Sequence, residues 1–79
     1  MVESNKFKST IGSRLKDYRT SRVQSLAEFS FYTGIGIASL SEIENGKVTP
    51  SVKTLVKLYK NTNISFEWLL MGEGKMLRE

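Results

Sequence analysis

The side chains most able to do chemistry in this 79-residue chain are polar groups suited to binding rather than to catalysis. The sequence has no cysteine and no histidine, which removes thiolate metal sites, the commonest metal ligand and the commonest general base. Its Asp and Glu residues are scattered, and no nucleophile–base pair can be assembled from their spacing. We therefore expect no enzymatic activity, no cofactor and no metal.

Binding groups gather in the stretch Ile37–Asn45, which reads IASLSEIEN. Leu40 and Ile43 lie three residues apart, as on one buried helix face, and Gly46 follows as a helix stop. We place Ser39 beside this buried pair. The opposite face then carries the side chains available to a ligand, which are Ile37, Ala38, Ser41, Glu42 and Asn45.

A second short helix, predicted over Ser25–Thr33, must position that stretch, and Ser25 suits its N-cap. Gly34 and Gly36 form the turn between the two helices. Two helices joined by a short glycine-containing turn constitute a helix-turn-helix unit, whose second helix enters the major groove when the unit binds DNA. A nucleotide-binding loop at the turn is excluded, because no hydrophobic strand precedes it and no third glycine follows at the required spacing.

The chain resembles a known family in an ordered set of motifs. IxxLSEIENGKVTPS, followed by LVKLYKNTNISFEWLLMGEG, is similar to the phage repressor/Cro-like (XRE-type) helix-turn-helix family. That family shows a recognition helix ending in I-E-N-G-K or I-E-R-G-K, a loop with proline, and a W-L-L-x-G helix. The resemblance covers roughly Ile11–Gly74 and is greatest to the N-terminal DNA-binding domain of a lambdoid-type phage repressor. It implies an all-α, compact five-helix lambda-repressor-like domain that regulates transcription by binding DNA.

The resemblance also implies which residues meet DNA. Base contacts fall on Ile37, Ala38, Ser41 and Glu42, and contacts to the DNA backbone fall on Ser25, Leu26, Asn45, Lys47, Thr49, Ser51 and Lys53. Ile37 and Ala38 can pack on thymine methyl groups, while Glu42 can accept from cytosine N4 or repel a misplaced phosphate. Leu26 stands where the family usually has Gln, so that contact falls to backbone N–H groups of the helix start. We therefore expect fewer direct base contacts than in relatives that carry Gln, and a larger contribution of DNA shape to sequence specificity.

Two charged residues are expected to hold the reading helix in place. In resembling repressors, the Arg at the position of Arg19 pairs with the Glu that ends the recognition helix, here Glu44. We interpret this as a partly buried structural ion pair. Arg14, Lys16 and Arg22 are expected to face solvent.

The sequence divides into an arm, a domain and a tail. Residues 1–8, with Lys6 and Lys8, predict a flexible basic arm that either frays or touches DNA. Residues 9–71 form the helix-turn-helix domain, with further helices near 9–21, 51–61 and after Ile64, and with Pro50 in the first turn of the helix near 51–61. Residues 72–79 are read as a C-terminal tail or the start of a linker.

The predicted core is Ile11, Leu15, Phe29, Leu40, Ile43, Leu55, Leu58, Ile64 and Trp68, with Tyr59 or Val56 added.

Two pairs of apolar residues suggest partners other than DNA. Phe66 and Leu69 lie where repressor-like relatives join two subunits, so we expect a homodimer on a (pseudo)palindromic operator. Phe31 and Tyr32 occupy positions that are usually polar and exposed, and they either extend the core or form a surface for another protein. The alternative function is therefore a protein-interaction module or an antitoxin that uses the same fold, and a protein antagonist is a possible partner.

The charge distribution favours a nucleic-acid partner. The net charge is +4 and the pI is about 9.6. Residues 1–60 carry ten Lys and Arg against five Asp and Glu, whereas residues 61–79 carry two against three. The basic excess thus coincides with the predicted DNA-reading part. Without an apolar run of about 20 residues or a signal peptide, we expect no membrane association and a place in the bacterial cytoplasm at the nucleoid.

Overall fold

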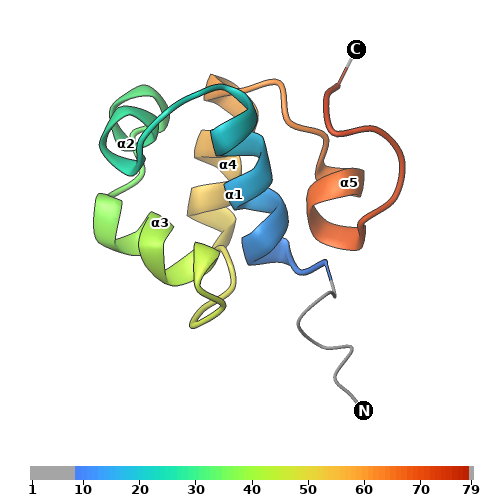
Figure 1. Cartoon of the computed structure of the whole chain (residues 1–79), viewed down its shortest axis with the longest axis horizontal. Coiled ribbons are helices and arrows are strands. Elements are labelled where there is room, and N and C mark those ends of the chain that lie inside the picture. Colours follow the sequence, from blue (N-terminus) through green and yellow to red (C-terminus); the bar gives the residue numbers. More distant parts are fainter. Residues whose placement is uncertain (1–8, 79) are drawn as a thin grey trace.

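The computed structural model describes residues 9–78, so the expected arm at residues 1–8 lies outside the described part. Within this described part five helices follow one another: α1 (Ile11–Ser21), α2 (Leu26–Thr33), α3 (Ile37–Glu44), α4 (Val52–Asn61) and α5 (Phe66–Met71). The predicted all-α, five-helix fold is confirmed. In Figure 1, α1 and α4 lie at the centre, α2 and α3 on one side and α5 on the other. No helix in residues 9–78 is both long and apolar enough to span a bilayer.

Hydroxyl side chains fix where most of these helices begin. Thr10, Ser25, Ser51 and Ser65 each precede a helix and accept a hydrogen bond from a backbone N–H of its first turn. Because Ser51 is the N-cap of α4, Pro50 lies before the cap and not in the first turn, which corrects the sequence-based placement. The remaining boundaries agree with prediction to within about two residues.

The core lies where the five helices α1–α5 meet. Its buried residues are Leu15, Tyr18, Phe29, Ile35, Leu40, Ile43, Leu58, Ile64 and Leu69. Six of the predicted core residues are in this set, and the other three, Ile11, Leu55 and Trp68, pack half-buried against it. Val56 and Tyr59 remain exposed, so α4 turns only one side of its apolar surface inward.

The short helix α5 is oriented differently from the prediction. The Leu69 side chain is 0% exposed, so it offers no surface to a second subunit and the assignment of Leu69 to a dimer interface is wrong. Its carbonyl accepts a 2.9 Å hydrogen bond from Nε of Arg14. Arg14 is itself buried, which corrects its expected exposure. Its positive charge suits the C-terminal end of α5, where helix carbonyls lack partners.

The described residues of the expected tail, 72–78, fold back on the domain. The N–H of Ser65 donates to Met76 O at 2.8 Å and the N–H of Arg78 donates to Asn63 O at 2.7 Å, flanking an isolated bridge between Ile64 and Leu77. The Arg78 guanidinium donates to the carbonyls of residues 59, 62 and 64. Figure 1 shows this segment curling around α5. The folded unit therefore extends to Arg78.

Candidate nucleic-acid interface

Helix α3 presents a continuous outer surface beside a buried one. Leu40 and Ile43 are buried in the core, as predicted. Ile37, at the start of the helix, is 50% exposed. Ala38, Glu42 and Asn45 are also exposed and Ser41 is half-buried, so the five residues assigned to the ligand-facing side lie at or near the surface. Ser39 is exposed too, which corrects its placement beside the core and adds one hydroxyl to the outer surface.

The turn before α3 is held by contacts that the sequence did not reveal. Gly34 ends α2 with φ 78°, a left-handed conformation that glycine adopts without steric cost. Ile35 inserts into the core at 3% exposure. From α4, Lys57 Nζ donates to Gly34 O at 2.9 Å and Asn61 Nδ2 donates to Thr33 O at 3.1 Å. Lys57 is therefore half-buried rather than solvent-facing, and it ties α4 to the helix-turn-helix unit.

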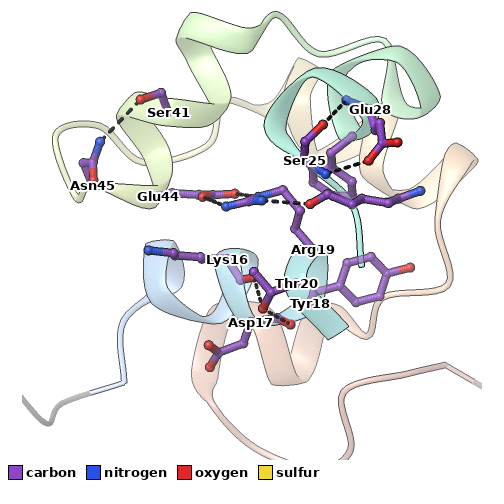
Figure 2. A network of polar contacts seen from close by, with 12 residues as sticks. Lys16, Asp17, Tyr18, Arg19, Thr20, Ser25, Glu28, Ser41, Glu44 and Asn45 are labelled. Carbon is purple, nitrogen blue, oxygen red and sulfur yellow. Dashed lines mark hydrogen bonds and ion pairs between the residues drawn. The ribbon is translucent and has the colours of Figure 1, made fainter. Parts of the chain in front are cut away.

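The ion pair expected from the resemblance is present and is bidentate. Arg19 Nε donates to Glu44 Oε2 at 2.8 Å, and Nη2 donates to Oε1 at 2.9 Å. The third guanidinium nitrogen, Nη1, donates to Gln24 O at 2.8 Å. The two side chains are only 11% and 5% exposed. Figure 2 shows the pair lying between α1 and α3.

The ion pair also shifts the pKa of Arg19. The hydrogen bond to Glu44 raises the pKa of Arg19, against the opposing effect of burial. Arg19 thus joins α1, the turn after it and the end of α3 through one permanently charged group. The C-terminal end of α3 is therefore fixed to α1 by a planar contact with a defined direction.

A glycine allows α1 and α3 to approach closely. A Cβ atom added to Gly12 would collide with the backbone carbonyl oxygen of Ile43. Only a residue without a side chain fits here, because the obstacle is backbone and cannot move aside like a flexible side chain. Together, Gly12 and the Arg19–Glu44 pair determine how far α3 stands from α1 and how it is rotated.

Some of the residues assigned to DNA phosphates have side chains that are already engaged within the domain, whereas others have exposed side chains. Ser25 and Ser51 use their hydroxyls as helix caps, accepting from the N–H groups of Glu28 and Thr54. Leu26 is half-buried and packs against the core, so only its backbone can reach a phosphate. Lys47, Thr49 and Lys53 are exposed along the α3–α4 loop and the start of α4. Cationic and hydroxyl groups thus continue from the end of α3, as phosphate binding requires.

Asn45 is oriented by its own helix. Its Nδ2 donates to Ser41 Oγ at 3.3 Å, and Figure 2 shows the two side chains facing each other at the end of α3. This leaves the second N–H and the carbonyl oxygen of the Asn45 amide, together with the hydroxyl hydrogen of Ser41, for a ligand. Within residues 9–78, no cluster of three Asp, Glu, His or Cys residues has an arrangement that would hold a metal ion.

Comparison with known proteins identifies a family and several relatives. A family described as "Helix-turn-helix domain" matches residues 12–75. An uncharacterized HTH-type transcriptional regulator, RghRB of Bacillus subtilis, is 34% identical over 67 residues, covering 84% of this chain and 48% of that protein. The SPbeta prophage-derived regulator YonR of Bacillus subtilis is 38% identical over 61 residues, covering 77% and 56%.

A phage protein is matched over most of its length. The ImmF control region 10 kDa protein of Bacillus phage phi105 is 32% identical over 69 residues, which cover 87% of this chain and 77% of that protein. The chain thus spans about half the length of the two bacterial relatives and most of the phage one. No solved structure matches the chain.

Proposed function

Because this chain belongs to the helix-turn-helix family of the phage repressor/Cro type, we propose that it is a sequence-specific DNA-binding transcriptional regulator. The observation that carries the proposal is the outer face of α3, left open while its inner face and its end are locked to α1. A helix held in this way can enter the major groove as a rigid reader. Acting on genomic DNA, the protein works in the bacterial cytoplasm at the nucleoid.

The proposed division of labour follows the chemistry of the exposed groups. Ile37, Ala38, Ser41 and Glu42 contact base edges, and Ser39 joins them as a further hydroxyl. The phosphate contacts come from Lys47, Thr49 and Lys53, with backbone N–H groups at the starts of α2 and α4 and the amide of Asn45. The apolar tip of α3 favours thymine methyl groups, and the remaining specificity comes from DNA shape.

We further propose that two copies bind a (pseudo)palindromic operator and act there as a repressor of the phage type. With Leu69 in the core, the interface falls on the apolar groove between α4 and α5, about 350 Å³ in volume. The groove is lined by Val52, Leu55, Val56, Tyr59, Lys60 and Phe66, and the proposed interface therefore includes Phe66. Val52 adjoins Lys53, so the proposed interface lies next to one of the proposed phosphate contacts.

Selection from random double-stranded DNA tests the proposal. We expect the full chain to enrich a motif with two half-sites about one helical turn apart. Fluorescence anisotropy on that motif should show affinity that falls steeply as salt rises, and the variant Ile37→Glu, which places a carboxylate at the tip of α3, should lose the preference for it. The absence of any enriched motif, or affinity that is indifferent to salt, would contradict a DNA-binding function.

A further inference from the structure

A second surface lies at the end of the molecule where α1, α2 and α4 terminate. A cavity of about 250 Å³ opens there, lined by Arg22, Gln24, Phe29, Tyr32, Thr33, Asn61 and Thr62. Asn61 and Thr62 end α4, whereas Ser51 and Lys53 of the proposed phosphate contacts begin it. Ten residues of helix separate these ends by about 15 Å. Figure 1 places the loop before α4 at the bottom of the view and the end of α4 at the top, beside α2.

Large apolar side chains lie at or beside this cavity without being buried. Phe31 is 82% exposed and Tyr32 is 61% exposed, and their rings meet edge to face with centroids 5.5 Å apart. The alternative that they extend the core is therefore wrong. Val23, between two lining residues, is 89% exposed. Neighbouring exposed aromatic rings of this kind are typical of protein interaction sites, because monomers rarely keep such apolar area in water.

Val23 also carries backbone strain. Its φ is 56°, in the left-handed region that a β-branched residue disfavours. Asn or Gly would occupy this position with less strain, and Val gains nothing from burial in the monomer because its side chain is in solvent. The backbone strain at Val23 is not offset by any packing of its side chain within the monomer. A contact between that side chain and another molecule would account for it.

Arg22 supplies a free charge at the rim. Its guanidinium carbon lies 5.6 Å from the centroid of the Tyr18 ring, so the group is partly oriented by the aromatic face. Among residues 9–78 its side chain makes no hydrogen bond, and neither does that of Gln24. Two other charged groups of α2 and α4 are already engaged, Glu28 by the N–H of Ser25 in the α2 cap and Lys57 by the carbonyl of Gly34. The rim therefore presents an unpaired guanidinium fork, which matches a carboxylate in a bidentate arrangement.

From this combination we propose that the surface formed by Arg22, Val23, Phe31, Tyr32 and the adjoining cavity binds a segment of another protein. The segment carries a carboxylate side chain next to a bulky apolar one. The carboxylate pairs with Arg22, and the apolar side chain packs on Tyr32 and enters the cavity above Phe29. Aromatic residues and Arg are the residue types that dominate binding energy at protein interfaces. This inference stands apart from DNA recognition by α3.

The probe for this surface is a phage-displayed library of short random peptides selected on the full chain. Selection is run with prior depletion on the double variant Phe31→Ser/Tyr32→Ser, so only peptides that need the aromatic pair survive. Both positions are exposed, so the double variant should melt within a few degrees of the parent. Affinities of recovered synthetic peptides are then measured for the parent, the double variant, Arg22→Gln and a control. The control is Lys16→Gln, which alters an exposed charge on α1, the helix that Arg22 caps.

We expect enriched peptides with Asp or Glu beside a bulky apolar residue. Binding should weaken roughly thirtyfold in the double variant and in Arg22→Gln, as at an interface hot spot, and stay unchanged in Lys16→Gln. DNA affinity of the double variant should equal that of the parent. Because the peptide measurements involve no DNA, they test this proposal even if the chain proves not to bind DNA. Failure to enrich peptides, enriched peptides without acidic residues, equal binding by Arg22→Gln, or dimerisation of the chain through the aromatic pair would each overturn the proposal.

Discussion

Arg19 and Glu44 form a contact in which each charge depends on the other. Both side chains are largely removed from solvent, and three guanidinium nitrogens are engaged. An ion pair this deeply buried fixes the orientation of α3 against α1 more than it adds net stability. Removing one partner, however, leaves the other charge buried and unpaired. Because the pKa of Arg19 is raised, the stabilisation that its titration contributes is complete at neutral pH and is lost as pH rises through that raised value.

We predict that Arg19→Ala destabilises the domain by on the order of 3 kcal/mol, since Glu44 is left desolvated. Below the melting temperature, the preferred DNA sequence should be the same as for the parent. Thermal melts and selection from random DNA measure the two effects, with Lys16→Ala as an exposed control on the same helix. A variant that melts like the parent but selects another motif would show that Arg19 reads DNA rather than supporting α3.

Val23 gives a prediction of the opposite sign. Replacing Val23 by Asn should stabilise the domain by about 1 kcal/mol, because Asn tolerates positive φ and no packing is lost at 89% exposure. The matched control is Val48→Asn, at an exposed valine without positive φ, which should bring no gain. Denaturant titrations compare the two. If Val48→Asn stabilises equally, removal of surface apolar area explains the gain and backbone strain does not.

At the scale of elements, the distance between α1 and α3 depends on a single missing side chain. Gly12→Ala should destabilise the domain by on the order of 3 kcal/mol, because the added methyl group meets the Ile43 carbonyl and α3 must shift. Gly36→Ala is the control: the nearest atom to its added Cβ is Ser39 Oγ at 4.0 Å and its φ is negative. Melting temperatures of the two variants provide the measurement. Equal, small losses would mean that the close approach contributes little.

The helices were predictable because their signals are local. Ser or Thr before each of four helices and the glycines around α3 mark the boundaries in the sequence itself. The orientation of α5 was not predictable, since its six residues are almost all apolar and periodicity cannot choose between Trp68 and Leu69. The roles of Arg14, Gly12 and Arg78 also escaped prediction, because each depends on a backbone group far away in the sequence.

The site was predicted unevenly for a similar reason. Exposure of Ile37, Ala38 and Glu42 follows from helical spacing once Leu40 and Ile43 are assigned to the core. The inward turn of Ile35 gives no periodic signal, because it lies between two glycines. The exposure of Phe31 and Tyr32 could not be decided either, since their hydrophobicity alone favours burial and only the structure shows that Phe29 is the aromatic residue of α2 that enters the core.

At the scale of the whole molecule, the proposed dimer surface adjoins the proposed phosphate contacts. Val56→Glu places a charge in the α4–α5 groove at a position 45% exposed in the monomer, so the chain should fold but dimerise poorly. We expect affinity for the two-half-site motif to fall by about tenfold or more while affinity for a single half-site is kept.

Val23→Glu is the control for that experiment, because it makes the same change in net charge away from the groove. Sedimentation velocity on motif DNA should show two copies of the parent and of Val23→Glu per duplex, and one copy of Val56→Glu. Two bound copies of Val56→Glu with unchanged affinity would rule out the groove as the dimer interface.

The central claim is that α3 reads bases while the loop after it holds phosphates. The most direct test measures affinity against salt concentration for Ile37→Ala and Lys47→Ala, each on the selected motif and on unrelated DNA. Ile37→Ala should cost on the order of 1–3 kcal/mol on the motif and almost nothing on unrelated DNA. Lys47→Ala should weaken binding to both alike and lower the salt slope by roughly one unit. If Lys47→Ala instead weakens only the motif while Ile37→Ala weakens both DNAs equally, α3 is not the reading helix.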